Sequence, residues 1–240
     1  MIDIHTHILP GLDDGARDME DSLSMAALAL KSGVHTLVAT SHANTFFKEY
    51  SIEEYLQRLE AFRKALDEVK LPLRVFSGME IYMTREVPRM IREGRLLSLN
   101  QTGYFLTEFS FGIEQEEMDE MLHDLMELGV TPVIAHPERY RCVQESESGI
   151  AKWKNRGCLL QVNRGSIFGR FGSGAKQCVD RLLDQHMVTC IASDAHKPYE
   201  RTTYMADVKE YMEQEYSFEY SKKLLYDNPK RILEGEKVVQ

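Results

Sequence analysis

MIDIHTHILPGLDD, residues 1–14, is the stretch that decides the fold and suggests the chemistry. Its isoleucines alternate with polar residues at the period of a β-strand, which predicts that His5 and His7 point to the same side of an extended backbone. Two imidazoles so placed can chelate one metal ion, and the turn at Gly11 is followed by two aspartates that add carboxylate ligands. An isolated His-x-His pair is weak evidence, so the hypothesis requires more ligands elsewhere in the chain.

Length and composition indicate an ordinary globular protein. The 240 residues are enough for one large core, and we expect a single domain over residues 1–240. Hydrophobic residues make up 43% and charged residues 28%, so disorder is not expected. No apolar run approaches the ~18 residues of a membrane-spanning helix, and Met1 leads directly into the first strand without a signal-peptide pattern. We therefore expect a cytoplasmic protein with no membrane insertion.

Charge and cysteine spacing argue against two further classes of protein. The net charge is −9 and no basic run exceeds two residues, whereas nucleic-acid backbone contacts need clustered Lys and Arg, so nucleic acid is not an expected partner. The cysteines lack Cys-x-x-Cys spacing, so we expect reduced thiols rather than a zinc knuckle or a disulfide framework. They are Cys142, Cys158, Cys178 and Cys190.

Strand and helix patterns alternate along the whole chain. Beyond the opening strand, apolar runs predict strands at 35–40, 73–77, 104–107, 131–135, 158–162 and 188–192. Amphipathic patterns predict helices at 18–32, 51–69, 87–93, 115–128, 152–156 and 175–185, and a last helix broken at Asn228-Pro229. About seven such units predict a parallel α/β fold, a distorted (β/α)7 TIM-like barrel. An open doubly wound sheet is the alternative, but its Gly-x-Gly-x-x-Gly turn is absent.

Side chains that bind metals follow the expected strands, unit after unit. In a parallel barrel the carboxyl ends of the strands converge on one face, so these residues should meet there. With the aspartate of the first turn added, the candidate ligands are His5, His7, Asp14, His42, Glu80, Glu108, His136, Asp194 and His196. The other histidines, His35, His123 and His186, fall at a strand start or on helices and serve as an internal control.

Nine candidates exceed what one tetrahedral ion needs, so we infer two or three divalent ions. Imidazole and carboxylate ligands without thiolate suit Mn²⁺, Fe²⁺ or Zn²⁺. Three divalent ions carry +6 and the four candidate carboxylates carry −4, which leaves a residual charge of about +2 and favours an anion. Such a site is expected to lower the pKa of bound water toward ~7 and to bind a phosphate ester.

Two arginines strengthen the phosphate interpretation. Arg139 lies three residues beyond His136, and Arg201 lies seven beyond Asp194, both in loops expected above the metal face. Either guanidinium can hold phosphate oxygens with its planar fork. The alternative for each arginine is a surface salt bridge with a neighbouring glutamate, Glu138 or Glu200.

One competing pattern matches cysteine-dependent phosphatases. Cys158-Leu-Leu-Gln-Val-Asn-Arg164 has the Cys-x₅-Arg spacing of that class. Its chemistry needs the intervening backbone curled into a nest of N–H groups, whereas Leu159, Leu160 and Val162 predict a strand. A strand would separate Cys158 from Arg164 by roughly 20 Å. We therefore do not expect the cysteine mechanism.

The motifs resemble those of the PHP (polymerase and histidinol phosphatase) metallo-phosphoesterases. The four family motifs are DIHTH at 3–7, TSH at 40–42, PVIAHPER at 132–139 and SDAH at 193–196. Four further stretches resemble the bacterial manganese-dependent protein-tyrosine phosphatases of capsule and exopolysaccharide loci, the CpsB/CapC type. They are ILPGLDDG at 8–15, GMEI at 78–81, QVNRGS at 161–166 and NPKRILEG at 228–235, so the resemblance spans essentially the whole chain.

The resemblance implies a trinuclear site in a distorted (β/α)7 barrel. It implies that Arg139 and Arg201 clamp the phosphate while a bridging hydroxide attacks phosphorus, and that His42 belongs to the catalytic group. The substrate it implies is phosphotyrosine on the tail of a bacterial tyrosine kinase that controls polysaccharide export. The implied ligands are His5, His7, Glu80 and Asp194 for one ion, Glu80, Glu108 and His136 for a second, and Asp14, His42 and His196 for a third.

Two other functions stay open at the level of sequence. One keeps the metals but acts on a small phosphomonoester such as histidinol phosphate, or on a nucleic-acid diester, which the acidic composition disfavours. The other is a non-catalytic regulatory binder of the kinase. The aromatic residues Phe46, Phe47 and Tyr50 either line the entrance of the site or pack onto the neighbouring helix. The native metal, the oligomeric state and the kinase are not determined by the sequence.

Overall fold

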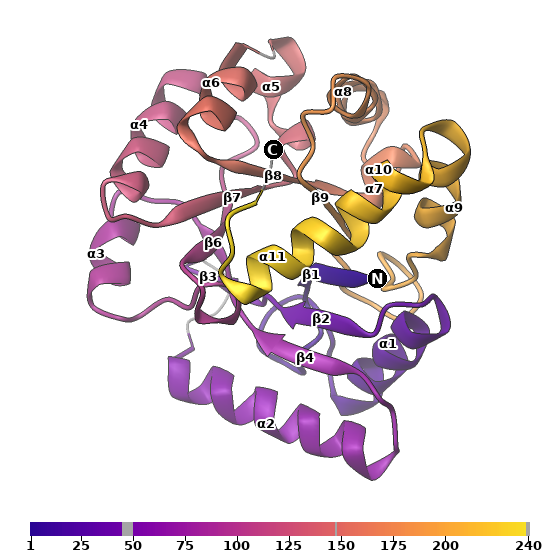
Figure 1. Ribbon diagram of the computed structural model, residues 1–240. Helices are drawn as coiled ribbons and strands as arrows, with labels where there is room; N and C mark the ends of the chain where they lie inside the picture. Colours follow the sequence, from indigo (N-terminus) through magenta and orange to yellow (C-terminus); the bar gives the residue numbers. More distant parts are fainter. Residues whose placement is uncertain (45–49, 147, 239–240) are drawn as a thin grey trace.

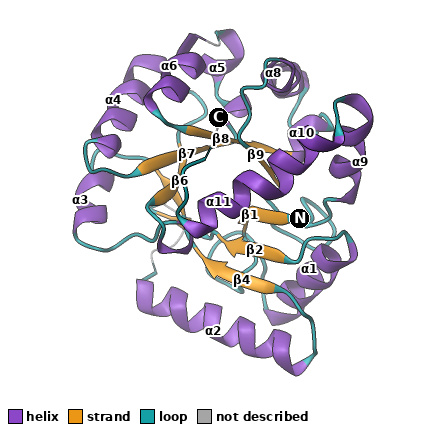
Figure 2. Ribbon diagram, viewed as in Figure 1, coloured by secondary structure: helices purple, strands orange, loops and turns teal. Residues whose placement is uncertain are grey.

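Parallel strands and intervening helices account for most of the chain in the computed structural model, which describes residues 1–44, 50–146 and 148–238 (Figures 1 and 2). Every expected strand is present within a few residues of its predicted bounds. The described strands are β1 Ile2–Thr6, β2 Thr36–Ala39, β3 His42–Ala43, β4 Arg74–Ser77, β5 Glu80–Tyr82, β6 Tyr104–Glu108, β7 Thr131–Ala135, β8 Leu159–Asn163 and β9 Cys190–Ala192.

Helices lie around the outside of these strands (Figure 1). Two of them begin at the residues that the sequence indicates, because the side chains of Asp18 and Ser51 accept hydrogen bonds from backbone N–H groups of the first turn. The α-helices are α1 Met19–Lys31, α2 Ile52–Glu68, α3 Val87–Arg92, α4 Gln115–Met126, α5 Arg141–Glu145, α6 Ser148–Arg156, α7 Arg164–Ile167, α8 Ser173–Asp184, α9 Ala206–Glu215, α10 Phe218–Lys222 and α11 Asn228–Glu234. The other helical segments are η1 Leu99–Gln101, η2 Pro137–Arg139 and η3 Lys223–Asp227.

The strands form a barrel in which all described pairings are parallel. One sheet has the order β1-β2-β4 and the other β3-β5-β6-β7-β8-β9. In the described residues β2 and β3 are two halves of one interrupted strand, as are β4 and β5, which reduces nine strands to seven barrel positions. The ring closes where the backbone of His7 donates to Ala195 O at 2.8 Å and that of Asp194 donates to His5 O at 3.0 Å. The predicted distorted (β/α)7 barrel is confirmed.

A register shift in β1 changes the expected alternation of side chains. Asp3 pairs with Leu37 and Thr6 with Ala39, so three steps on β1 oppose two on β2. Ile4 packs in the cluster inside the barrel, and His5, the next residue, also reaches inward. Simple alternation would have put these neighbours on opposite faces; a bulge with one extra residue lets both point inside.

The barrel interior is apolar below the site. Ile2, Ile4, Leu106 and other inward side chains form one buried cluster, to which Ile232 of α11 also belongs. Figure 1 shows α11 running across the strands on the near side. Gly78 lies at the break between β4 and β5, where a Cβ would come within 2.7 Å of a Val38 methyl group. The lower barrel is therefore packed, which leaves the opposite end for chemistry.

One expected feature is wrong. Asn228-Pro229 does not break the last helix, because Pro229 lies in the first turn of α11 and the chain runs helically from α10 through η3 into it. The segment η3 is a wide π-type turn. This widening removes the need for the N–H that proline lacks, so the helix continues past Pro229. Among the described helices, none combines the length and the apolar composition needed to cross a membrane.

Candidate metal centre

All nine candidate ligands lie together at the carboxyl end of the barrel. A cavity of about 330 Å³ is open there, and His5 and His7 lie fully buried beside its carboxylates. Its lining consists of Asp14, His42, Glu80, Tyr82, Glu108, Phe111, His136, Arg139, Asp194, His196 and Arg201. The control histidines, at positions 35, 123 and 186, are exposed and absent from this lining.

His5 and His7 aim their imidazoles at one point. Their Nε2 atoms are 3.2 Å apart, and Glu80 Oε2 lies 3.2 Å from the first and 3.1 Å from the second. Asp194 Oδ1 lies 3.5 Å from both. These distances place four potential ligand atoms around a space that could hold one metal ion.

Glu80 also faces the opposite wall of the cavity. Its Oε1 lies 3.0 Å from His136 Nε2, and its Oε2 lies 3.0 Å from His42 Nδ1. Glu108 reaches the same two imidazoles, each at 3.6 Å. Glu80 is therefore shared between two neighbouring groups of ligands.

A third group lies nearer the cavity mouth. Asp14 Oδ1 lies 3.7 Å from His42 Nε2 and 3.4 Å from His196 Nε2. The rings of His7 and His196 are 3.8 Å apart between centroids, so His7 borders this group as well as the first. Asp14 is the most exposed of the carboxylates in the three groups, with 55% of its side chain accessible.

Several buried atoms of the site lack a hydrogen-bond partner in the described part of the chain. They are His42 Nδ1, Glu80 Oε2, Asp194 Oδ1 and His196 Nε2. Buried polar atoms are rarely left unpaired, and these four lie among other ligand atoms within the groups described above. The residues present thus fit divalent cations, which would satisfy these atoms together.

The electrostatics agree with a site built for cations. Burial acts to raise the pKa of Glu80, but His5 and His42 outweigh it and hold this pKa well below its usual range. Burial and the charge of Glu80 raise the pKa of Glu108 to about 8. Burial lowers the pKa of His136 to about 4, so its imidazole is neutral near pH 7, the form that binds metals.

Residues that the ligand pattern did not single out hold the ligands in place. Gln161 Oε1 lies 2.7 Å from His5 Nδ1, and Asn163 Nδ2 donates to Asp194 Oδ2 at 2.6 Å. Both residues lie on β8 two positions apart, so their side chains point to the same side of the strand. The sequence QVN therefore indicated that the two amides face the site together. Hydrogen-bonded partners of this kind orient metal ligands.

Asp13 is a third supporting residue, next to a candidate ligand. Its Oδ2 lies 2.8 Å from His7 Nδ1 and accepts from the backbone N–H of His42 at 2.9 Å. Its Oδ1 accepts from Gly15 N at 2.9 Å. Burial acts to raise the pKa of Asp13, but His7 outweighs it and keeps this pKa well below its usual range. Of the two aspartates in the first turn, Asp13 holds His7 and the backbone of His42 in place, whereas Asp14 faces the cavity.

The two arginines contact the cavity rather than their neighbouring glutamates. Arg201 Nη2 forms an ion pair with Asp194 Oδ2 at 2.5 Å, and Arg139 Nη1 lies 3.6 Å from the same oxygen. Glu138 is instead buried and accepts a hydrogen bond from the backbone N–H of Asn163 at 3.0 Å. Arg201 has a positive φ of +47°, a left-handed backbone conformation that residues other than glycine adopt uncommonly.

The cysteine alternative disagrees with the structure. Strand β8 occupies residues 159–163, between Cys158 and Arg164, as the sequence predicted. Burial raises the pKa of the Cys158 thiol to about 12, which suppresses the nucleophilic thiolate.

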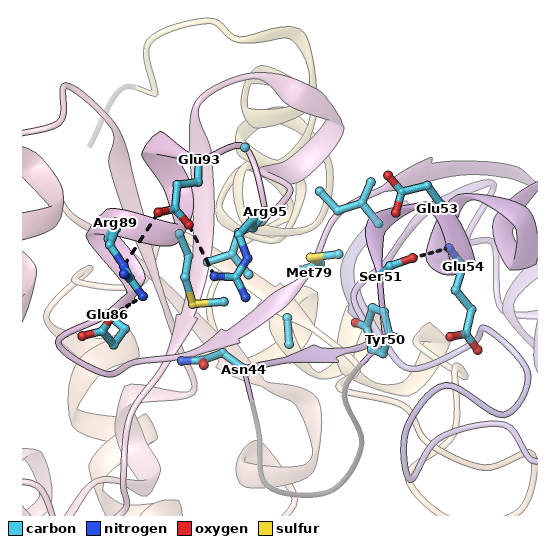
Figure 3. A pocket seen from close by; sticks show the side chains of 15 residues that line it. Asn44, Tyr50, Ser51, Glu53, Glu54, Met79, Glu86, Arg89, Glu93 and Arg95 are labelled. Carbon is cyan, nitrogen blue, oxygen red and sulfur yellow. Dashed lines mark hydrogen bonds and ion pairs between the residues drawn. The ribbon is translucent and has the colours of Figure 1, made fainter.

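A second cavity, of about 790 Å³, lies outside this centre between α2 and α3 (Figure 3). Glu93 faces both Arg89 and Arg95 there, and these ion pairs are exposed.

Tyr50 lines this second cavity. Its ring stacks on that of Tyr55 of α2, with 6.2 Å between the centroids, which agrees with the alternative that it packs onto the helix. Phe46 and Phe47, for which the sequence left the same two alternatives, lie outside the described residues.

Comparison with known proteins identifies the family. The family model "Capsular polysaccharide synthesis, CpsB/CapC" matches residues 1–234. The chain belongs to the CpsB/CapC family. Curated members include tyrosine-protein phosphatase YwqE of Bacillus subtilis, 34% identical over 99% of this chain and 93% of that protein. Tyrosine-protein phosphatase CpsB of Streptococcus pneumoniae is 31% identical over 97% of this chain and 98% of that protein.

The fold of this CpsB/CapC chain agrees with a solved structure of the family. A crystal structure from work on B. subtilis YwqE and S. pneumoniae CpsB, described as unique metal-dependent tyrosine phosphatases, superposes with a TM-score of 0.93. The two chains are 34% identical, and the match covers 100% of this chain and 96% of the other. The family resemblance inferred from the sequence motifs is thereby confirmed.

Proposed function

We propose that this chain is a metal-dependent tyrosine-protein phosphatase linked to capsule synthesis, as its CpsB/CapC relatives are named. The observation that carries the proposal is the convergence of nine imidazole and carboxylate side chains with two arginines around one cavity. The ligands suit divalent cations, and the arginines suit the phosphate of the substrate.

The three ligand groups would hold up to three divalent ions, of which Mn²⁺ is our first choice and Fe²⁺ or Zn²⁺ the alternatives. When bound, such ions supply activated water and neutralise phosphate oxygens. His5, His7, Glu80 and Asp194 would hold one ion, Glu80, Glu108 and His136 a second, and Asp14, His42 and His196 a third. The short distances within each group support this division.

Arg139 and Arg201 would bind the phosphate oxygens of the substrate. Both lie at the cavity, with 18% and 27% of their side chains exposed, so solvent-borne phosphate can reach them. The Nε of Arg201 is buried and has no hydrogen-bond partner among the described residues, which leaves a charged donor free for an anion. His42 would act in the catalytic group as a ligand that joins two of the ion sites.

The proposed substrate is phosphotyrosine on a protein. The physiological target would be the tail of a bacterial tyrosine kinase that controls polysaccharide synthesis, an inference supported by the capsule link in the family name. Residues 1–240 would act as a single catalytic domain, since both ends of the chain contribute to the same barrel.

Phosphate release from matched phosphotyrosine and phosphoserine peptides tests this function. The protein is stripped with a chelator and reloaded separately with Mn²⁺, Fe²⁺ or Zn²⁺. We expect release from the tyrosine peptide that depends on metal, with His136→Ala as the inactive control. Metal-loaded protein that releases no phosphate from tyrosine peptides would refute the proposal; small phosphomonoesters and kinase binding without turnover would then be measured.

A further inference from the structure

Two aromatic rings flank the guanidinium of Arg139. Its central carbon lies 4.3 Å over the ring of Phe111 and 4.3 Å over the ring of Phe171. Phe111 follows β6 and lines the cavity, whereas Phe171 lies in the turn between α7 and α8. The guanidinium carbon lies over the faces of both rings, and an arginine held by cation–π contacts keeps its N–H groups as donors for an anion.

Phe171 serves the second arginine as well. The guanidinium carbon of Arg201 lies 5.6 Å over the same ring, within the distance of a cation–π contact. Both arginines also approach Asp194 Oδ2, at 2.5 and 3.6 Å. One phenylalanine and one carboxylate oxygen are therefore common to both phosphate-binding side chains.

Backbone hydrogen bonds hold the two segments that carry these rings. The carbonyl of Phe111 accepts a hydrogen bond from Arg141 N at 2.9 Å. The turn that carries Phe171 is held by a bond from Arg170 N to Gly165 O, also at 2.9 Å. A Cβ on Gly165 would lie 2.7 Å from the Phe171 ring, so only glycine lets the ring lie so close to the start of α7.

We propose that Phe171 is a positioning residue for substrate phosphate, which it serves by stacking on Arg139 and Arg201 together, with Phe111 completing the stack on Arg139. This inference rests on the proposed phosphatase function, because that function assigns the two arginines to phosphate. Long arginine side chains lose conformational freedom when they bind, and rings that already restrain them reduce that cost. The stack would thus act on phosphate affinity and would leave the metal ligands untouched.

The chain offers a matched control in the same turn. Phe168 is another phenylalanine, 45% exposed, whose ring lies 5.5 Å from the guanidinium carbon of Arg164. Arg164 is paired with Asp207 and does not line the metal cavity. Phe168→Leu thus removes the same kind of contact from an arginine outside the proposed site.

The test measures binding of inorganic phosphate to the manganese-loaded protein by calorimetry, which requires no turnover. Phe171→Leu, which keeps apolar bulk but removes the ring, should raise the Kd for phosphate about tenfold, equivalent to about 1.4 kcal/mol. Phe171→Tyr should restore affinity to within about twofold of the wild type, because a tyrosine ring also stacks on arginine. Phe168→Leu should leave the Kd for phosphate unchanged.

Manganese content is measured on the same samples, and the Nε–H NMR signals of the arginines are recorded on zinc-loaded protein, because Zn²⁺ is diamagnetic and does not broaden them. We expect unchanged manganese content in Phe171→Leu, together with a shift of the Arg139 and Arg201 signals. Wild-type phosphate affinity in Phe171→Leu, an equal loss in Phe168→Leu, or loss of manganese along with phosphate would each overturn the proposal. Failure of the wild type to hydrolyse phosphotyrosine would refute the phosphatase function separately, because phosphate binding is measured without substrate.

Discussion

Replacing Asp13 with asparagine should weaken metal binding without removing a proposed ligand. Its carboxylate contacts His7 Nδ1 at 2.8 Å and accepts from the backbone of His42 at 2.9 Å, so it orients two proposed ligands. Asparagine keeps the shape of the side chain but removes its negative charge. That charge favours the observed orientation of His7 and makes its imidazole a more basic metal ligand. The loss of such a partner typically weakens metal affinity about 10- to 100-fold, or about 1.4–2.8 kcal/mol.

The assay is competition for Mn²⁺ between the protein and a fluorescent chelator, followed by phosphatase rate against manganese concentration. Asp13→Asn should show weaker affinity and should recover activity at high manganese, and Asp13→Ala should be weaker still because three hydrogen bonds are lost. Asp207→Asn is the control, since that carboxylate pairs with Arg164 away from the cavity. Manganese affinity within twofold of the wild type in Asp13→Asn would refute the reasoning.

Three further results are expected. Tyr140→Phe should lower the free energy of unfolding by about 1–3 kcal/mol in urea titrations, because the hydroxyl bridges Ala135 O and Phe109 N from a buried position; an unchanged midpoint would contradict this. Cys158→Ser should keep the phosphatase rate of the wild type, and a large loss would revive the cysteine mechanism. In metal-free protein the pKa of Glu108 is raised from its usual 4.5 to about 8, so between these values the folded state binds more protons than the unfolded state. Thermal stability should therefore fall as the pH rises from about 4.5 to 8; Glu108→Gln should flatten that slope, and an equal slope would count against it.

The order of strands and helices was predictable because each element carries its own pattern. Asp18 and Ser51 begin helices through hydrogen bonds to residues three positions later, which a reader of the sequence can locate. The break expected at Pro229 failed because the neighbouring π-type turn, which accommodates proline, has no comparable sequence signal.

The supporting side chains of the site were harder to predict. Gln161, Asn163 and Asp13 bind their partners across gaps of 156, 31 and 6 residues. Only Asp13 is close in sequence to the ligand it orients. The aromatic stack on Arg139 likewise joins loops that follow different strands.

The types of the candidate ligands, and their place after successive strands, are local properties of the chain. They suffice to predict a parallel barrel with metal-binding side chains at one end. Which oxygen meets which imidazole, and how His5 turns inward beside Ile4, depend on the β1 bulge and on the breaks before His42 and Glu80. These features exist only through pairing between strands, because a shift of one residue in register reverses the side that every later side chain faces.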